Sequence, residues 1–485
     1  MRSFFTVVSL LALSRAAVIP LRRSLNERQD AAEKLVVAHF MVGNTFPYTL
    51  QDWTDDINLA TASGLSGFAL NVGGVLGDFQ DTQTANAFQA AEAIGPDFKL
   101  FFSLDMSALA CATVDDGAAL RTRVTNFISR PNYLQRNGKA FVSTFAGEKC
   151  TFGQGSVGDG WKTQFAQHPD LQGKMEFVPA FFIDPATFSP QFSGVMDGDF
   201  NFNSGWPLEV TTDFANGIST NLTGAPPDGA NALNKFIGST DTDTQHIQSL
   251  ATLAAGGAKL TYMAAVSPWF FTHFGPDSFN KNFIFLADQH LYSRRWENLI
   301  AERDQIDLVE VVTWNDYGES HYIGPIKGAL PPGSEAWVNG FPHQAFLDLT
   351  KVYATAFKTG QPPVVDKDEI IMYARPHPAN AQASDALGPP TTFQVTQDAV
   401  WAVVMATAPG SVTLSTTATD AQTFDVQAGI NKFSIPIAPG GTLNGVLSRN
   451  GANVVQLATP GTDFTFNGAP TTFNYNTFVA SAVAA

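Results

Sequence analysis

The most constraining feature of the 485-residue sequence is a regular alternation, from residue 34 onward, of short apolar runs with longer amphipathic segments. Such alternation is typical of βα units. The runs predict strands at 34–40, 67–72, 99–106, 140–146, 176–184, 194–202, 259–266 and 307–314. Strands that are apolar on both faces belong to a parallel sheet covered by helices. Eight βα pairs therefore predict an α/β fold, a (β/α)8 barrel of the TIM type at 34–360.

The amphipathic segments begin with recognisable capping residues. They predict helices at 49–63, 82–94, 116–129, 241–255, 291–304 and 342–358.

Past Gly360 the helical periodicity ends, and Val, Thr, Phe and Gly dominate after Gln361-Pro362-Pro363. Mixed apolar and polar runs between Pro and Gly turns are typical of antiparallel strands. They predict strands at 392–396, 399–407, 411–415, 423–426, 432–436 and 453–457. We expect a C-terminal antiparallel β-sandwich domain at 361–485, attached directly to the barrel.

The N-terminus has the pattern of a secretory signal. A short basic n-region, an apolar run and small residues make 1–16 a signal peptide that is too short to cross a membrane. Arg22 and Arg23 lie in a polar stretch that we interpret as a propeptide at 17–33. We therefore expect a secreted monomer, extracellular or in a cell wall, with no membrane partner.

Cysteine content and charge narrow the chemistry. Cys111 and Cys150 are the only two cysteines, and in an oxidising compartment they predict a disulfide. Asn221 begins the sequon Asn-Leu-Thr, which predicts a glycosylated surface loop. A net charge of -16 excludes nucleic acid as a partner. The histidines lack the close spacing of zinc motifs, and no phosphate-binding loop follows a strand, so we expect no metal and no cofactor.

The densest polar cluster follows the eighth predicted strand, at 309–322. Asp316 and Glu319 lie three residues apart in this cluster, and an acid–base pair for sugar cleavage consists of two such carboxylates. The structural alternative is that Asp316 caps a turn while Glu319 pairs with Arg294 or Arg295. The residues around the pair that we expect to contact substrate are Trp314, Asn315, Tyr317 and His321.

Other polar and aromatic residues come where predicted strands end, which is where the active sites of TIM barrels lie. The further candidates for substrate binding are His39, Asn71, Asp105, Asp184, Asp199, Trp206 and Trp269. Asp105 and Asp184 are each the first charge after an apolar strand, so either is also a candidate second catalytic acid, with a helix cap or turn as the structural alternative. The tryptophans either stack on sugar rings or belong to the core.

These segments resemble a known family. The residues that carry the resemblance are Ala38-His39-Phe40-Met41-Val42-Gly43, the strand that ends at Asp105, Phe181–Pro185, Ser267-Pro268-Trp269-Phe270 and Trp314-Asn315-Asp316-Tyr317-Gly318-Glu319-Ser320-His321-Tyr322. They resemble glycoside hydrolase family 71, the fungal α-1,3-glucanases also called mutanases. The resemblance implies a secreted, endo-acting enzyme that hydrolyses the α-1,3-glucan of fungal cell walls with inversion, and it places the acidic pair on Asp316 and Glu319 without assigning acid and base.

Alternatives to this reading are a hydrolase of another wall polysaccharide, such as β-glucan or chitin, and a non-catalytic protein that binds the wall. Inversion also makes a geometric demand, because the two carboxyls must stand about 6.5 to 9.5 Å apart to admit a water. If Asp316 and Glu319 lie much closer, a retaining mechanism or a different partner, Asp105 or Asp184, becomes preferable. Many family relatives carry a separate sugar-binding module after a linker, whereas here we expect the C-terminal domain to stabilise the barrel.

Overall fold

The computed structural model describes residues 33–217, 233 and 235–484, and Lys34–Ala485 form one compact unit. The expected signal peptide at 1–16, the expected propeptide apart from its last residue, and Asn221 lie outside the described residues. Within the described part of the chain, no helix is long and apolar enough to cross a membrane.

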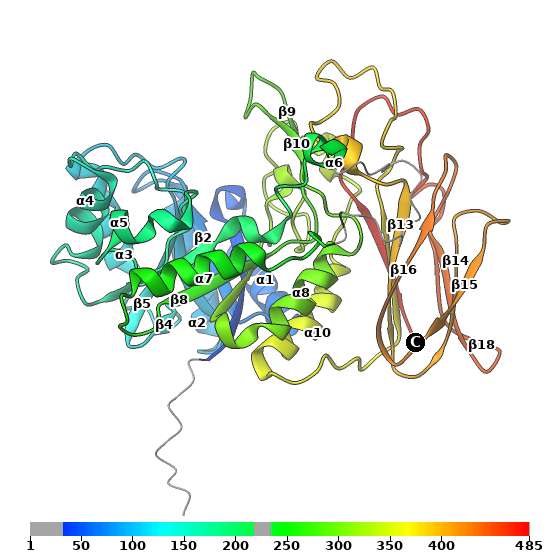
Figure 1. Ribbon diagram of the computed structural model, residues 1–485, viewed down its shortest axis with the longest axis horizontal. Helices are drawn as coiled ribbons and strands as arrows, with labels where there is room; N and C mark the ends of the chain where they lie inside the picture. The colour runs from blue at the N-terminus through cyan, green and yellow to red at the C-terminus, as the bar shows by residue number, and fades with distance from the viewer. Residues whose placement is uncertain (1–32, 218–232, 234, 485) are drawn as a thin grey trace, which may run out of the picture. The chain divides into compact units, whose positions relative to one another are not determined.

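A curved, mainly parallel sheet forms the first half of the fold (Figure 1). Its strands run in the order β4-β5-β3-β2-β1-β11-β8-β7, with β6 paired to β5. The parallel strands are β1 (Leu35–Met41), β2 (Gly67–Val72), β3 (Lys99–Asp105), β5 (Lys139–Phe145), β6 (Met175–Phe177), β7 (Gly198–Asn201), β8 (Thr261–Val266) and β11 (Leu308–Val311), and the short β4 (Gln135–Arg136) is antiparallel to β5. Each of the eight strands predicted for this region is present.

Strands β6 and β7 are shorter than predicted. Pro179 has no N–H to donate, and the chain turns into a 3-10 helix, η3 (Pro185–Thr187), after Asp184. Backbone hydrogen bonds nevertheless join the two segments: Asp197 N–H donates to Phe177 O at 2.8 Å and Phe200 N–H to Pro179 O at 2.9 Å. Backbone hydrogen bonds therefore connect the segment of β6 to the segment of β7.

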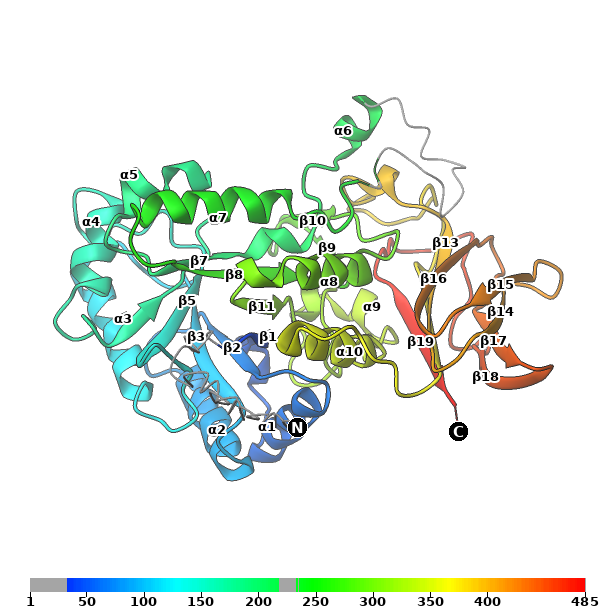
Figure 2. The same ribbon diagram turned by 60° about the horizontal axis from the view of Figure 1, so that its bottom comes forward.

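Helices lie beside this sheet, as Figure 2 shows for α7 next to β7 and β8. The six predicted helices are α1 (Leu50–Ala62), α2 (Phe79–Ile94), α3 (Val114–Phe127), α7 (Asp241–Leu253), α8 (Leu291–Ala301) and α10 (Phe346–Thr359). Thr49 and Thr113 cap α1 and α3 in reciprocal capping boxes with Asp52 and Asp116. Shorter elements connect them: η1 (Val42–Thr45), α4 (Val157–Trp161), η2 (Lys162–Ala166), α5 (Phe188–Phe192), η4 (Phe202–Gly205), α6 (Thr212–Gly217), η5 (Arg303–Gln305), η6 (Tyr317–Glu319) and α9 (Glu335–Val338).

The C-terminal region contains two four-stranded antiparallel sheets, in the orders β16-β13-β12-β19 and β15-β14-β17-β18 (Figure 1). The strands are β12 (Glu369–Ala374), β13 (Ala399–Ala406), β14 (Gly410–Ser415), β15 (Gln422–Val426), β16 (Gly429–Pro436), β17 (Asn444–Arg449), β18 (Ala452–Ala458) and β19 (Phe478–Val483). Apolar residues from both sheets, such as Ile370 and Leu447, share one buried cluster. The strand predicted at 392–396 is wrong, because Thr392 adopts a left-handed φ of 72° and the chain forms the 3-10 turn η7 (Phe393–Val395).

Two further features connect or extend the segments that follow the parallel strands. The first is a hairpin that the sequence analysis did not predict, and the second is the disulfide that it did predict. An antiparallel hairpin, β9 (Phe271–Phe274) with β10 (Lys281–Ile284), follows β8. A disulfide joins Cys111 to Cys150, with their Cα atoms 5.0 Å apart, and so links the segment after β3 to the segment after β5. Both features lie near the ends of the parallel strands, where the polar residues gather.

Candidate active site

The acidic residues Asp316 and Glu319 lie in the loop that follows strand β11. The strand is fully buried, and the chain then folds back on itself, since Thr313 N–H donates to His321 O at 2.7 Å and Ile323 N–H to Thr313 O at 2.9 Å. Inside this loop the Thr313 hydroxyl accepts from Asp316 N–H at 2.8 Å. The loop thus presents Asp316 and Glu319 together, each partly buried.

The two carboxylates and a histidine form a tight group. One carboxylate oxygen each of Asp316 and Glu319 and a ring nitrogen of His321 all lie within 4.8 Å of one another. Glu319 Oε1 lies 2.7 Å from Lys281 Nζ, and Glu319 Oε2 lies 3.0 Å from His321 Nε2. This spacing would also suit metal ligands, but each oxygen of Glu319 already lies within hydrogen-bond distance of a side-chain nitrogen.

Glu319 does form an ion pair, although not with the arginines considered from the sequence. Its partner is Lys281 on β10, whereas Arg295 makes a fully buried pair with Asp243 at 2.6 Å. The prediction that Glu319 forms an ion pair is therefore confirmed, but the predicted partner, Arg294 or Arg295, is wrong.

The surroundings push the pKa values of the two acids apart. Burial, followed by the negative charge of Glu319, raises the pKa of Asp316 to about 6. Burial opposes ionisation of Glu319, but the hydrogen bond with His321 and the charge of Lys281 outweigh it and lower the pKa of Glu319 to about 2. Between these values Asp316 holds a proton while Glu319 is ionised, which is the division that an acid and its partner need.

Three motif residues that we expected to bind substrate are buried instead. Asn315 bridges to β1, accepting from Met41 N–H at 2.7 Å and donating to Met41 O at 3.2 Å. Trp314 is fully buried, and its ring lies 5.1 Å from that of Phe68. The Tyr317 hydroxyl donates to Pro325 O at 2.8 Å. These side chains hold the loop in place and offer no face to a sugar.

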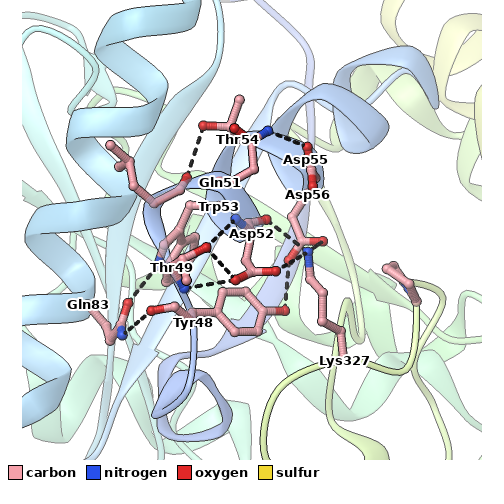
Figure 3. Close-up of polar contacts among 12 residues, drawn as sticks. Tyr48, Thr49, Gln51, Asp52, Trp53, Thr54, Asp55, Asp56, Gln83 and Lys327 are labelled. Atoms are coloured by element: carbon pink, nitrogen blue, oxygen red, sulfur yellow. Dashed lines mark hydrogen bonds and ion pairs between the residues drawn. The ribbon is translucent and has the colours of Figure 1, made fainter.

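The segment after the motif is anchored to the start of α1, as Figure 3 shows. Lys327 N–H donates to the Tyr317 hydroxyl at 3.0 Å, and Lys327 Nζ lies 3.0 Å from Asp56. Tyr48 donates to the other oxygen of Asp56 at 2.8 Å (Figure 3). Burial raises the pKa of Asp56. Lys327 therefore both places a positive charge beside a buried acid and fixes the backbone that follows the loop of Asp316 and Glu319.

At the ends of the other strands, some of the predicted substrate-binding residues are buried in the sheet and others cap turns. His39 and Asn71 are buried, and His39 Nδ1 lies 2.6 Å from Glu310 Oε1 inside the sheet. Asp105 caps a turn, accepting from Ser107 N–H at 3.0 Å, yet its charge also acts on Lys281. Asp184 is exposed and caps η3 by accepting from Ala186 N–H at 3.0 Å.

A pocket of about 310 Å³ lies at the ends of β6 and β7. It is lined by Phe181, Phe182, Ile183, Asp184, Phe200, Asn201, Phe202, Asn203, Trp206, Leu208, Glu209, Thr242, Gln245 and His246. The Nδ2 of Asn201 is buried and has no hydrogen-bond partner among the residues that the structure describes. Trp206 connects the pocket to the acid pair, because its ring centroid lies 5.6 Å from that of His321.

Within the pocket wall, Asp199 does not reach the surface. It is fully buried, and its Oδ2 lies 2.7 Å from His246 Nδ1, so it orients the histidine that faces the pocket. His246 and Gln245 were missed from the sequence because they lie on helix α7 and not at a strand end. The polar side of α7 was the signal that could have found them.

Trp269 is also a core residue. It is fully buried, donates through Nε1 to Tyr475 O at 2.8 Å, and has the guanidinium of Arg375 4.5 Å from its ring centroid. Its contacts are with the C-terminal region, so a role in stacking on sugar is not supported.

Comparison with known proteins gives the same family as the motif. The family model described as Glycosyl hydrolase family 71 matches residues 32–485. The glucan endo-1,3-alpha-glucosidase agn1 of Schizosaccharomyces pombe is 36% identical over 434 residues, covering 88% of this chain and 91% of the relative. The mutanase Pc12g07500 of Penicillium rubens is 30% identical over 442 residues, covering 90% and 87%. The ascus wall endo-1,3-alpha-glucanase of S. pombe is 29% identical over 458 residues, covering 91% and 96%. On the span of the family match and the identity to these relatives, the chain belongs to glycosyl hydrolase family 71.

Proposed function

We propose that this protein is a secreted, endo-acting hydrolase of the α-1,3-glucosidic bonds in fungal α-1,3-glucan, acting as a monomer without a cofactor. The observation that carries the proposal is the pair Asp316 and Glu319, whose pKa values diverge within one loop. The names of the relatives, which are endo-1,3-alpha-glucanases and a mutanase, support the choice of polymer.

The proposed architecture is a closed (β/α)8 catalytic barrel at 34–360 followed by a β-sandwich at 361–485. The hydrogen bonds from Asp197 and Phe200 to the β6 segment support closure of the barrel. The buried cluster shared by the two antiparallel sheets supports a sandwich. In such a barrel the catalytic loop lies at the end where all eight strands finish.

Asp316 is the proposed general acid because it is the member of the pair that keeps its proton in mildly acidic solution. Its proton would pass to the glycosidic oxygen as the bond to the anomeric carbon breaks. Glu319, ionised beside it, would stabilise the positive charge that develops on the sugar ring or bond to the anomeric carbon. Water then attacks that carbon, displacing Glu319 where it has bonded, and the proton that the water loses returns to Asp316.

The short distance within the pair bears on stereochemistry. Oxygens within 4.8 Å leave no room for the water that an inverting pair holds between carboxyls about 6.5 to 9.5 Å apart. With Glu319 as the partner, the spacing favours retention. Inversion, as the resemblance implies, requires a second carboxylate from across the strand ends, and Asp105 is the candidate because its charge already acts on Lys281.

The proposed substrate contacts lie in the pocket beside the acid pair. Trp206 and Asp184 remain from the sequence-based set, and Asn201, Gln245 and His246 join them. An amide with a free N–H, a fixed imidazole and aromatic edges are groups that bind sugar hydroxyls and ring faces.

The proposal is tested by incubating the purified protein with insoluble α-1,3-glucan, β-1,3-glucan and chitin. We expect soluble oligosaccharides from α-1,3-glucan alone, because the relatives named above act on that linkage. Release from β-1,3-glucan or chitin instead would assign another wall polysaccharide, and binding to α-1,3-glucan without release would contradict hydrolysis. Proton NMR of the first products gives the anomer: a β-anomer, the inverted product, identifies a partner other than Glu319, and an α-anomer identifies Glu319.

A further inference from the structure

The hairpin β9–β10 brings a cation to the catalytic loop. Lys281 begins β10, and its Nζ lies 2.7 Å from Glu319 Oε1. The opposite strand also touches the loop, because a Cβ built on Gly318 would lie 3.1 Å from the ring of Phe274. In the register of the hairpin, Lys281 pairs with this same Phe274. The hairpin and the catalytic loop are therefore in contact at two adjacent points.

Residues from the C-terminal region hold this hairpin from behind. Thr391 N–H donates to Asn282 O at 3.0 Å, and Ile284 N–H donates to Thr391 O at 3.2 Å, so the chain at Thr391 continues the hairpin as a third extended segment. The Asn282 side chain lies 2.7 Å from His273 Nδ1, which fixes the two strands to each other.

The same histidine connects the hairpin to a carboxylate of the C-terminal region. His273 Nε2 lies 2.8 Å from Asp385 Oδ2, and this oxygen also accepts from Phe473 N–H at 3.1 Å. Both side chains are nearly buried, with 5% and 10% of their surfaces exposed. Hydrogen bonds thus run from Asp385 through His273 to Asn282, the residue next to Lys281.

We call the hydrogen-bonded residues Asp385, His273 and Asn282 the brace. A brace is needed because an exposed ion pair is weak. The Lys281 side chain is 46% exposed, and surface pairs contribute about 0 to 1 kcal/mol because ordering two flexible side chains offsets most of the attraction. A lysine on a free loop would leave Glu319 for much of the time. A lysine on a braced hairpin loses less conformational freedom when it pairs, so its charge stays near the acid pair.

We propose that Lys281 is a positioning residue that keeps Glu319 ionised and oriented beside Asp316, and that Asp385, through His273 and Asn282, holds Lys281 in that place. The inference deepens the proposed function, on which it rests. It assigns to the C-terminal region a part in the chemistry of the active site.

The charged groups that face Glu319 set the expected pH effect. They are Lys281 from β10, His321 and Asp316 from the catalytic loop, and Asp105 from the end of β3, whose charge acts on Lys281. Without Lys281 both carboxylates lose a stabilising positive charge. Both limbs of the pH profile should therefore move to higher pH, whereas a lysine with a purely structural role would leave the profile in place.

The test compares K281M, K281R and D385N with a control, K351M, which removes an exposed lysine that is paired with the exposed Asp366. On soluble α-1,3-linked oligosaccharides, we expect K281M to move the acid limb of kcat/KM upward by about one pH unit or more. K281R should restore the wild-type profile, D385N should move it in the same direction by less, and K351M should not move it. An unmoved profile in K281M overturns the role of Lys281, and an unmoved profile in D385N overturns the brace.

A second measurement does not require turnover. NMR titration of 13C-labelled glutamate carboxyls, with E319Q to assign the signal, reports the pKa of Glu319 directly. We expect a higher pKa in K281M than in the wild type, and equal values would overturn the proposal even if the activity assays had already contradicted the proposed function. Conversely, a raised pKa with no hydrolysis of α-1,3-glucan by the wild type would support the positioning role while rejecting the substrate.

Discussion

At the scale of single residues, the central arrangement is a pair of acids with unlike surroundings. Lys281 and His321 lie against the two oxygens of Glu319, whereas the Asp316 backbone N–H donates to the Thr313 hydroxyl and, among the described residues, no cation lies within ion-pair distance of the Asp316 carboxylate. His321 is itself fixed, being fully buried and packed against the rings of Trp206 and Phe270. The difference between two chemically similar carboxylates therefore comes from which neighbours the fold supplies.

The proposed role of Asp316 as general acid predicts a dependence on the leaving group. D316N should lower kcat on α-1,3-glucan by about 10²- to 10⁴-fold, because no group then protonates the leaving oxygen. On a glucosyl fluoride, whose leaving group needs little protonation, D316N should recover much of its activity while E319Q should not. Circular dichroism of both variants controls for folding, and equal recovery by the two would contradict the assignment.

The divergent pKa values predict a bell-shaped pH profile. In the proposed mechanism Glu319 must be ionised, so kcat/KM should fall as the pH decreases through about 2. Asp316 must be protonated, so kcat/KM should also fall as the pH rises through about 6. The limbs report the coupled pair rather than either acid alone. Rates measured from pH 2 to 8 at constant ionic strength check this, and undiminished activity at pH 8 would exclude Asp316 as the acid.

At the scale of elements, each functional side chain depends on a neighbouring segment that fixes it. The loop after β11 is held by Lys327, which reaches the start of α1. The pocket wall is held by α7, whose His246 binds the buried Asp199 at the end of β7. The hairpin β9–β10 is held by the chain around Thr391.

Removing the anchor of the loop should weaken both stability and activity. In K327M the buried carboxylate of Asp56 keeps its bond from Tyr48 but loses its cation, which should lower the free energy of unfolding by about 1 to 3 kcal/mol. Because the Lys327 ammonium also donates to Asp52 O and so holds the segment after the motif against α1, kcat should fall without a change in the limbs of the pH profile. Urea denaturation gives the first value, and K351M serves as the control.

The sequence predicted most strands and helices, but it predicted few of the contacts between residues that are distant in the chain. Apolar alternation located the eight parallel strands and the six long helices, because burial on both faces or on one face leaves a direct pattern. The hairpin was missed because 271–284 mixes Phe with Gly, Pro and polar residues and shows no clear period. Strand β17, with Gly445 inside it, was missed for a similar reason.

The same division applies to the candidate site. The position of Asp316 and Glu319 followed from where a strand ends, which the sequence carries locally. The burial of Trp269 and Trp314, by contrast, depends on partners such as Tyr475 and Phe68 that are distant in sequence. The contact of Lys281 with Glu319 likewise depends on the hairpin, so no local pattern could predict it.

At the scale of the whole molecule, the C-terminal region is joined to the rest by buried polar contacts. Arg375 lies 2.6 Å from Asp288, with 4% and 0% of their side chains exposed. The buried His343 Nε2 lies 3.0 Å from Thr477 O, and a partly exposed ion pair joins Lys432 to Glu297. Burial raises the pKa of Asp288. Contacts of this kind are suited to a permanent interface rather than to a detachable module.

Breaking the Arg375 pair should therefore damage the fold as a whole. R375M should lower the free energy of unfolding by about 3 to 5 kcal/mol, because it leaves a fully buried carboxylate without its cation. Both parts should unfold in one transition, seen by differential scanning calorimetry. A variant that melts in two separate transitions, with an active barrel remaining after the first, would contradict this view.

The brace behind Lys281 also sets a rule for building chimeras from this family. The segment 271–284 and the segment 385–391 form one hydrogen-bonded unit although about a hundred residues separate them in the chain. In a recombinant that takes residues up to about 360 from one relative and the C-terminal region from another, the two segments of this unit would come from different parents. Such segments have not evolved together. Exchanges should therefore carry both segments from the same parent, and crossover points placed between them are expected to alter the pH range of the enzyme before they alter its substrate.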